Sequence, residues 1–536
     1  MKARAGIVLE GLNLTPEQLV GVARGGEKVF LNKGVERRIS ASREMLEKWI
    51  KEEKIVYGVT TGFGPFVSVL IPTKYQSQLQ HNLIRSHSAN VGPLFSREEV
   101  RAAMTLRVNA FAKGCSAVRL TTVNLLLELL NRGIHPCIPE WGSVGASGDL
   151  TPSAHVALTL MGEGKVEYKG KIMASAKAFK SEGLKPIELA AKEGLALING
   201  TTMMTGVGGL QTHDVWNLEY QAEIISALSI EGLLGSLEPF HPSGHKVKPH
   251  PGQIAVAKNL CKLLKGSKLV WDARKLEEVR SSLQKKMKEN GDVLETNIPI
   301  QNTYSLRATP QILGAVRDAI TYVKQQVVIE MNSANDNPLF FTEENLAYQG
   351  ANFHGQPLAL PMDVLSIAAT EIAVLSERRL NKILDRSRNN GLSAFLAGDR
   401  SGLHCGYEGA QYIPTSLVAE CRTLCNPASI QSIPSNEENQ DVVSMGLVAA
   451  RKAREIKNRV EYVLAVELLA ACEAVEARGI EKVSPAGKLV HQEVRKVIPP
   501  YNSSRVMHES IEKSRDLIHS GKLVGLIKSR VKDLEM

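Results

Sequence analysis

The residues of this chain whose types and spacing could do chemistry are first of all Ala146, Ser147 and Gly148, in a glycine-rich segment at 142–150. A tight turn that brings the Gly148 nitrogen onto the Ala146 carbonyl carbon would close a five-membered ring. Loss of water from that adduct and from Ser147 would leave a methylidene-imidazolone (MIO), an electrophile made from the chain itself. Ala146 is small, Ser147 supplies the leaving hydroxyl, and Gly148 has no side chain to hinder its nitrogen. A Gly-Ser segment alone is also typical of a simple turn or a phosphate-binding loop.

Further motifs accompany this segment in a fixed order along the chain. They are YGVTTGFG at 57–64, NLIRSHSANVG at 82–92, LING at 197–200, YSLR at 304–307, NSANDNP at 332–338, NFHGQ at 352–356 and NQD at 439–441. With these motifs, nearly the whole chain resembles the aromatic amino-acid ammonia-lyase and aminomutase family, which uses MIO. In detail it is most similar to the bacterial tyrosine 2,3-aminomutases of that family.

Composition is ordinary for a soluble globular protein with a substantial core. The 536 residues carry a net charge of +9, but the 65 basic and 56 acidic residues are interspersed, so we expect no nucleic-acid partner. The seven cysteines are scattered, and Cys421 and Cys425 lack the second pair that a zinc site needs. We therefore expect buried thiols in a reducing cytoplasm, no metal and no nucleotide cofactor. No stretch approaches the length and apolarity of a membrane span, and we expect no membrane partner.

The apolar pattern predicts a mainly helical fold. Strand-like segments are confined to 28–31, 55–57 and 165–173, the last around a turn at Gly170. Apolar residues recur at spacings of three and four from Ile312 to Val327, which predicts one helix there. A second such pattern runs over 440–478, and a helix of that length spans about 58 Å. Helices this long are typical of a multi-helix bundle.

The family resemblance implies the architecture in more detail. It implies an ammonia-lyase-like (fumarase/aspartase-like) long-helix bundle with a mixed N-terminal part that bears the MIO group. We divide the chain into three parts: an N-terminal MIO-bearing domain, residues 1–205, which includes a lid loop; a central long-helix bundle, residues 206–480; and a C-terminal helical segment, residues 481–536. The resemblance also implies a homotetramer whose active sites draw on more than one subunit.

Tyr57 is the candidate catalytic base. The β-proton of an aromatic amino acid is barely acidic and ammonia is a poor leaving group, so the reaction needs both an electrophile and a positioned base. Three glycines within 57–64 are typical of a mobile lid. An isolated phenol titrates near ~10, so positive potential from helix N-termini and from Arg307 would have to activate it. The alternative is an aromatic side chain packed at the end of a strand.

Arg307 suits a substrate carboxylate, because its planar guanidinium offers two parallel charge-assisted hydrogen bonds. A surface ion pair is the alternative. Tyr304, three residues earlier, would assist proton transfer or contact the amine. The resemblance implies that Asn199, Asn337 and Phe353 lie next to the prosthetic group or the substrate carboxylate. It also places Gly64 and Asn439 in the substrate site.

The residues at the family's selectivity positions favour a phenol ring. Ser86-His87 occurs in this place in histidine lyases too, so His87 alone leaves imidazole and phenol open. Histidine lyases have Glu where this chain has Gln440, and Tyr412 matches the tyrosine-active members. A pocket that hydrogen-bonds a hydroxyl discriminates against a ring without one. Pro299 departs from the family, since some tyrosine aminomutases have a tyrosine there.

The resemblance favours conversion of L-tyrosine to β-tyrosine through 4-hydroxycinnamate, with ammonia-lyase side activity. The alternatives are a tyrosine or phenylalanine ammonia-lyase, a phenylalanine aminomutase and, last, a histidine ammonia-lyase. A lyase opens its lid and releases both products, whereas a mutase keeps the lid shut until the amine re-adds at the β-carbon. The difference is one of relative rates and of loop stability, and no distinct catalytic residue separates the two.

Overall fold

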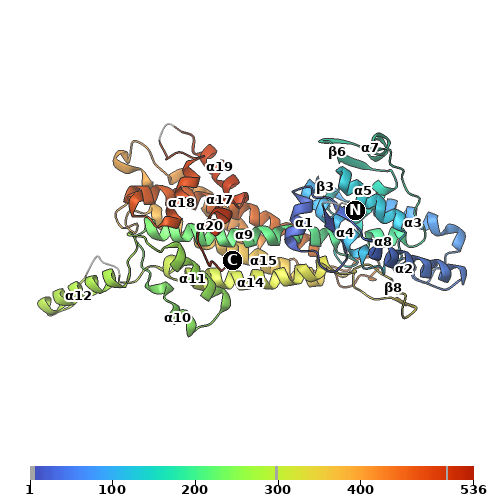
Figure 1. Ribbon diagram of the computed structural model, residues 1–536, viewed down its shortest axis with the longest axis horizontal. Coiled ribbons are helices and arrows are strands. Elements are labelled where there is room, and N and C mark those ends of the chain that lie inside the picture. The colour runs from blue at the N-terminus through green and yellow to red at the C-terminus, as the bar shows by residue number, and fades with distance from the viewer. Residues whose placement is uncertain (1–5, 296–299, 503–504, 536) are drawn as a thin grey trace. The chain divides into compact units, whose positions relative to one another are not determined.

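The computed structural model describes residues 6–295, 300–502 and 505–535 (Figure 1). Pro299 lies outside these ranges. The chain is mainly helical, as predicted, and divides into two compact units, each assembled from three stretches of sequence. Unit 1 contains Met1–His213, Tyr322–Asp363 and Pro427–Arg454, and unit 2 contains Asp214–Thr321, Val364–Asn426 and Glu455–Met536. The consecutive domains expected from the sequence stay a prediction.

Unit 1 combines helices with short strands. Its helices are α1 (Pro16–Ala23), α2 (Lys33–Lys51), α3 (Gln76–His87), α4 (Arg97–Ala112), α5 (Leu120–Arg132), α6 (Leu150–Leu160), α7 (Ser175–Glu182) and α8 (Glu193–Ile198). Its strands are β1 (Ile7–Val8), β2 (Val29–Phe30), β3 (Val91–Leu94), β4 (Ile134–Pro136), β5 (Pro139–Trp141), β6 (Lys165–Tyr168), β7 (Lys171–Ala174), β8 (Leu339–Phe341) and β9 (Leu346–Tyr348). The strands form small sheets: β1 pairs in parallel with β2, whereas β3–β5, β4–β6–β7 and β8–β9 are antiparallel.

Two of the three predicted strand segments are confirmed. β2 lies within 28–31, and the predicted turn at Gly170 joins β6 to β7 in a hairpin. The prediction of a strand at 55–57 is wrong, because this segment is irregular and Gly58 takes a positive φ of 66°. Val56 and Val59 are both buried, and a spacing of three does not fit the two-residue period of a strand.

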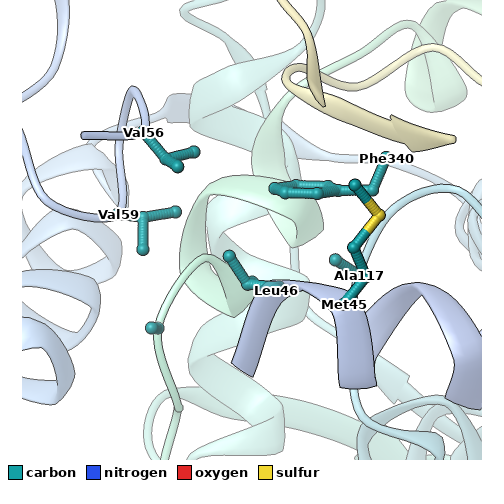
Figure 2. Close-up of a cluster of buried hydrophobic side chains, with 7 residues drawn as sticks. Met45, Leu46, Val56, Val59, Ala117 and Phe340 are labelled. Carbon is teal, nitrogen blue, oxygen red and sulfur yellow. The ribbon is translucent and has the colours of Figure 1, made fainter. Parts of the chain in front are cut away.

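A small hydrophobic cluster anchors the irregular segment that carries Tyr57 (Figure 2). Its buried members are Met45, Leu46, Val56, Val59, Ala117, Ala191 and Phe340. Met45 and Leu46 come from α2 and Phe340 from β8, so residues distant in sequence meet here. Because Val56 and Val59 flank Tyr57 in sequence and are both fixed in this cluster, the base of the predicted lid is held in place.

Unit 2 is built from helices, and some of them also contribute residues to unit 1. The helices that contribute to both are α9 (Thr202–Gly232), α14 (Thr309–Met331), α15 (Gln356–Leu384) and α17 (Gly446–Arg478). The others are α10 (Pro242–Lys246), α11 (Pro251–Leu263), α12 (Ala273–Asn290), α13 (Tyr304–Arg307), α16 (Glu408–Leu424), α18 (Pro485–Arg495), α19 (Met507–His519) and α20 (Lys522–Arg530). A buried ion pair joins α15 to α17, where Arg379 Nε lies 2.6 Å from Glu467 Oε1.

The two predicted long helices are present, with one corrected boundary. α14 contains the stripe from Ile312 to Val327. α17 begins at Gly446 and not at 440, because the chain before it forms a tight turn that is described below.

Two expectations about composition are also corrected. The helix α15 is long and apolar enough to cross a membrane by length and composition, although 72% of its most apolar window is buried in the protein, which is typical of a core helix. None of the seven cysteines, all of which lie within the described residues, forms a disulfide, but only Cys421 and Cys472 are buried; Cys405 is exposed and the other four are partly buried.

Candidate active site

A cavity of about 570 Å³ in unit 1 brings together most of the site residues that we predicted from the sequence. The predicted residues that line it are Tyr57, Gly64, His87, Ser147, Asn199, Asn337, Phe353, Asn439 and Gln440. Leu79, Leu83, Leu150, Leu195 and Ile198 line it as well, so its wall combines apolar side chains with polar ones. This combination is typical of a site for a small organic molecule with a ring.

The turn at Ala146-Ser147-Gly148 packs closely against Gly200 and has room only for glycine at its third position. Gly148 has a φ of 73°, and a Cβ placed on it would lie 2.1 Å from the Gly200 carbonyl oxygen. No residue with a side chain fits there. Two backbone hydrogen bonds hold the turn against Gly200: its nitrogen donates to the Ser147 oxygen (3.1 Å), and Asp149 N donates to the Gly200 oxygen (2.8 Å).

Ser147 is held at both of its oxygens. Its carbonyl oxygen accepts a second hydrogen bond, from Asn199 Nδ2 at 2.9 Å. Its hydroxyl Oγ, the atom that ring closure must expel, accepts a hydrogen bond from Gln440 Nε2 at 3.1 Å. Asn199 Oδ1 is buried and makes no hydrogen bond among the described residues. These residues therefore fit an MIO group at this position. The turn is small, the Ser147 hydroxyl that would leave has a hydrogen-bond donor beside it, and Asn199 Oδ1 is unpaired.

Two buried charged residues, Asp149 and Arg107, support the segments around the turn at 146–148, and sequence reasoning missed both. The Asp149 carboxylate accepts hydrogen bonds from Ser143 Oγ (2.9 Å) and Met204 N (2.7 Å), and burial raises its pKa to about 7. Arg107 Nη1 donates to the Asn199 carbonyl at 2.8 Å, and burial lowers the Arg107 pKa to about 10. Asp149 directly follows the reactive tripeptide, so its position was a signal, whereas Arg107 on α4 gave none.

Tyr57 faces the cavity from the irregular segment anchored by the hydrophobic cluster. Its side chain is half-buried and lines the cavity. Its hydroxyl oxygen accepts a hydrogen bond from the Gly64 backbone nitrogen at 3.1 Å. An N–H aimed at this oxygen stabilises negative charge on it, which is what a phenolate base requires.

His87 presents one acceptor nitrogen for a ligand. Its Nδ1 lies 3.0 Å from the Leu83 carbonyl oxygen, and a carbonyl only accepts, so Nδ1 carries the hydrogen. Burial lowers the pKa of His87, although the bond to Leu83 opposes this effect. A neutral ring protonated at Nδ1 leaves Nε2 as a hydrogen-bond acceptor. The ring can therefore receive a hydroxyl hydrogen from a bound molecule.

A further polar group of the wall, Asn337, comes from the segment before β8. Asn337 Oδ1 accepts a hydrogen bond from Gly350 N at 2.9 Å, so its amide nitrogen is the atom that a bound carboxylate can use. Asn337 is buried, and both Gly350 and Phe353 line the same cavity.

A tight turn at 435–440 borders the cavity, and sequence reasoning missed most of it. Asn436, Glu437 and Glu438 have φ values of 58°, 52° and 59°. Residues with side chains rarely adopt this left-handed conformation, and consecutive examples cluster at functional sites. Asn436 also lines the cavity. Its tolerance of positive φ was the one available signal in this segment.

Tyr304, Arg307 and Tyr412 belong to unit 2 and are absent from the described residues that line the unit 1 cavity. Tyr304 and Arg307 lie on α13 and line a separate cavity of about 420 Å³, with the Arg307 Cζ 4.5 Å from the Tyr304 ring centre. Tyr304 is 71% exposed and Tyr412, on α16, is 63% exposed. The Tyr412 hydroxyl donates to Glu408 at 3.2 Å.

Known proteins resemble this chain over nearly its full length. A family model described as aromatic amino acid lyase matches residues 14–496. A tyrosine ammonia-lyase from Cupriavidus metallidurans is 47% identical over 97% of both chains. An MIO-dependent tyrosine 2,3-aminomutase from Streptomyces globisporus is 44% identical over 99% of this chain and 98% of that one. The crystal structure of a tyrosine aminomutase from the same organism matches with a TM-score of 0.95, covering 99% of this chain and 100% of that one.

The fold is thus that of the ammonia-lyases and aminomutases, as the sequence predicted, and the protein is an enzyme of this class. The chain belongs to the aromatic amino acid lyase family.

Proposed function

We propose that the protein is an MIO-dependent enzyme that converts L-tyrosine to β-tyrosine through 4-hydroxycinnamate, with ammonia-lyase side activity. One observation carries the proposal: the hydroxyl of Ser147, in a turn that only glycine can complete, lines the same cavity as Tyr57 and His87. Ala146, Ser147 and Gly148 would form the group autocatalytically. Once formed, it supplies an electrophile that makes the substrate amine a better leaving group.

Tyr57 is the base in this proposal. Its oxygen takes the proton from the substrate β-carbon as the bond between the α-carbon and the nitrogen breaks, which leaves the double bond of 4-hydroxycinnamate. The Gly64 N–H, 3.1 Å from the Tyr57 oxygen, steadies the charge on that oxygen before the proton arrives. Asn337 would orient the substrate carboxylate through its amide nitrogen.

The choice of tyrosine rests on His87. Its Nε2 can accept the hydrogen of a phenol hydroxyl, and phenylalanine would leave this acceptor, on a half-buried side chain, without that partner. Gln440 argues against histidine as substrate, because an amide in place of the carboxylate of histidine lyases cannot pair with an imidazolium.

A tyrosine ammonia-lyase is the second candidate. The 47% identity to the Cupriavidus metallidurans enzyme favours it. Two contacts of the lid support the mutase. The Gly64 nitrogen donates a hydrogen bond to Tyr57, and Gly64 lies so close to Asn436 that an added Cβ would be 2.7 Å from the Asn436 amide nitrogen. Contacts of this kind slow lid opening and leave time for the amine to return to the β-carbon.

We also propose a cytoplasmic homotetramer in which neighbouring subunits complete each active site. Tyr304, Arg307 and Tyr412 are the side chains that we assign to this role, with Arg307 binding the substrate carboxylate. Mixing inactive Ser147→Ala and Arg307→Ala variants after dissociation and reassembly tests this assignment. Partial recovery of activity supports shared sites, whereas no recovery in a reassembled tetramer contradicts them.

The function is tested by incubating the purified protein with L-tyrosine and separating the products by chromatography over time. The proposal predicts steady formation of β-tyrosine with minor 4-hydroxycinnamate. 4-Hydroxycinnamate as the sole early product would make the protein a lyase. Turnover of phenylalanine without turnover of tyrosine would contradict the assignment of His87.

A further inference from the structure

The hydroxyl of Ser147 lies at the end of a chain of two side-chain hydrogen bonds. Ser435 Oγ donates to Gln440 Oε1 at 3.3 Å, and Gln440 Nε2 donates to Ser147 Oγ at 3.1 Å. We propose that Ser435 is a positioning residue for formation of the prosthetic group, because its hydrogen bond to Oε1 holds the Gln440 amide in place with the nitrogen toward Ser147. This inference rests on the proposed MIO-dependent function and assigns Gln440 a role before any substrate binds.

The backbone around these residues holds them in a fixed relation. Ser435 N donates to the Gln440 oxygen at 3.1 Å, and Gln440 N donates to the Ser435 oxygen at 3.2 Å. The chain closes this short pair by placing three consecutive residues, 436–438, in the left-handed conformation. Such a conformation is unfavourable for residues with side chains, so the surrounding contacts must over-determine it. The turn brings the Ser435 hydroxyl to the side-chain oxygen of Gln440.

The orientation of the Gln440 amide decides how it meets Ser147. The two ends of a carboxamide have nearly the same shape but opposite hydrogen-bonding roles. With the nitrogen toward Ser147, the amide donates to the hydroxyl oxygen. In the flipped orientation, the amide oxygen would instead accept the hydroxyl hydrogen and hold the group in place. In the first orientation the Ser435 hydroxyl donates to Oε1, whereas in the second it would have to turn and accept a hydrogen bond from the amide nitrogen.

Ring closure releases two waters, and the second one depends on this contact. In the first step a bond forms between the Gly148 nitrogen and the Ala146 carbonyl carbon. The Ala146 oxygen then leaves as water with the hydrogens of the Ser147 and Gly148 nitrogens. In the second step the Cα–H and Cβ–Oγ bonds of Ser147 break, a Cα–Cβ double bond forms, and Oγ leaves as water with the Cα hydrogen.

The contacts of Ser147 suit both halves of the second step. Removal of its Cα hydrogen places negative charge on its carbonyl oxygen, which Asn199 Nδ2 and Gly200 N already face at 2.9 and 3.1 Å. Departure of Oγ places charge on that oxygen, which the Gln440 N–H faces. Gln440 gives up no proton and only stabilises the leaving group.

The experiment measures how fast each variant matures. The full chain is made by cell-free synthesis, samples are quenched in acid at intervals, and intact mass gives the fraction lighter by two waters. Ser435→Ala is expected to mature about fivefold more slowly than wild type, equivalent to ~1 kcal/mol for one hydrogen bond. Ser435→Thr keeps the hydroxyl and is expected to mature at close to the wild-type rate.

Ser432→Ala is the matched control. It removes a hydrogen bond from the same segment, in which Val443 N donates to Ser432 Oγ at 2.9 Å, but leaves Gln440 untouched. Its maturation is expected to follow wild type. Equal slowing of Ser432→Ala and Ser435→Ala would reveal a general loosening of the loop and overturn the inference. A wild-type rate for Ser435→Ala would overturn it too.

Gln440→Leu provides a second, independent test, since it removes the donor itself. It is expected to slow maturation at least as much as Ser435→Ala, and the double variant is expected to be no slower than Gln440→Leu alone, because Ser435 acts through Gln440. Additive slowing in the double variant would overturn the inference. If the wild type never loses two waters, the proposed function fails, and that outcome is distinct from any difference among variants.

Discussion

Replacing Gly148 by alanine tests whether the shape of the turn is what permits ring closure. The new Cβ would lie 2.1 Å from the Gly200 oxygen, 2.2 Å from its carbonyl carbon and 2.6 Å from its Cα. All three atoms are backbone, so no side chain can rotate away. Either the turn moves away from Gly200, or Gly148 leaves its φ of 73°. Both movements disturb the backbone arrangement from which the Gly148 nitrogen must approach the Ala146 carbonyl carbon.

The cost of this substitution follows from the contacts it breaks. A left-handed alanine costs about 1–2 kcal/mol relative to glycine. Separating the turn from Gly200 removes two hydrogen bonds, one to the Ser147 oxygen and one from Asp149 N. Each of these two hydrogen bonds, when lost with its groups still buried, costs about 1–3 kcal/mol. The expected loss of stability is therefore about 3–8 kcal/mol.

Gly170→Ala isolates the backbone part of this cost. Gly170 has a φ of 74°, almost that of Gly148, but a Cβ there would meet no atom within 4 Å. We expect Gly170→Ala to lose about 1–2 kcal/mol and to mature normally. Gly148→Ala is expected to melt at a clearly lower temperature and to keep its full encoded mass. If Gly148→Ala melted like Gly170→Ala and still lost two waters, the reasoning about this turn would be refuted.

Three other changes test separate parts of the account. Tyr57→Phe should keep the loss of two waters in intact mass but abolish turnover of L-tyrosine, because only the base is removed; wild-type turnover would transfer that role to another residue. His87→Phe should lower kcat/KM for tyrosine relative to phenylalanine by about 10- to 100-fold, the cost of ~1–3 kcal/mol for an unpaired hydroxyl, and an unchanged ratio would remove His87 from substrate recognition. His135→Gln should change the pH dependence of stability: burial lowers the pKa of His135 to about 4, so folding favours its neutral form. The stability that comes from keeping His135 neutral is fully present above a pH of about 6.5 and is lost as the pH falls toward 4. The free energy of unfolding should fall by ~3 kcal/mol over this range. Gln retains an acceptor for Arg101, whose Nη1 lies 3.1 Å from His135 Nε2. Urea unfolding between about pH 6.5 and 4 should therefore show that the variant loses less stability on acidification than wild type. The same pH dependence in both proteins would contradict the lowered pKa of His135.

The sequence predicted the features that depend on local pattern. The apolar stripe from Ile312 to Val327 identified α14, since a helix in a core must bury one face. The hairpin around Gly170 followed from alternation and a turn residue. Both signals lie within about twenty residues of chain, where short-range geometry decides the outcome.

The errors arose where particular contacts, some distant in sequence and some within a turn, override the periodic pattern. The segment 55–57 reads as a strand, but Val56 and Val59 are drawn into a cluster with Phe340 from β8. The apolar pattern that begins at 440 predicts helix from there, but the pairing of Ser435 with Gln440 delays the start of α17 to Gly446.

The candidate site was predictable in its reactive residues and not in its supporting ones. The residue types and motifs of Ser147 and Tyr57 indicate their chemistry, a leaving hydroxyl and a base. Arg107 acts through contacts with Ala196 and Asn199, which are distant in sequence. Ser435 acts through Gln440 in a turn that no local pattern predicts.

The most direct test of the central claim is the mass of the proteolytic peptide that contains Ala146, Ser147 and Gly148 from the purified wild-type protein. The account predicts that this peptide is lighter than its encoded sequence by two waters, with the loss confined to these three residues. A peptide of full encoded mass from protein that turns over L-tyrosine would contradict the account.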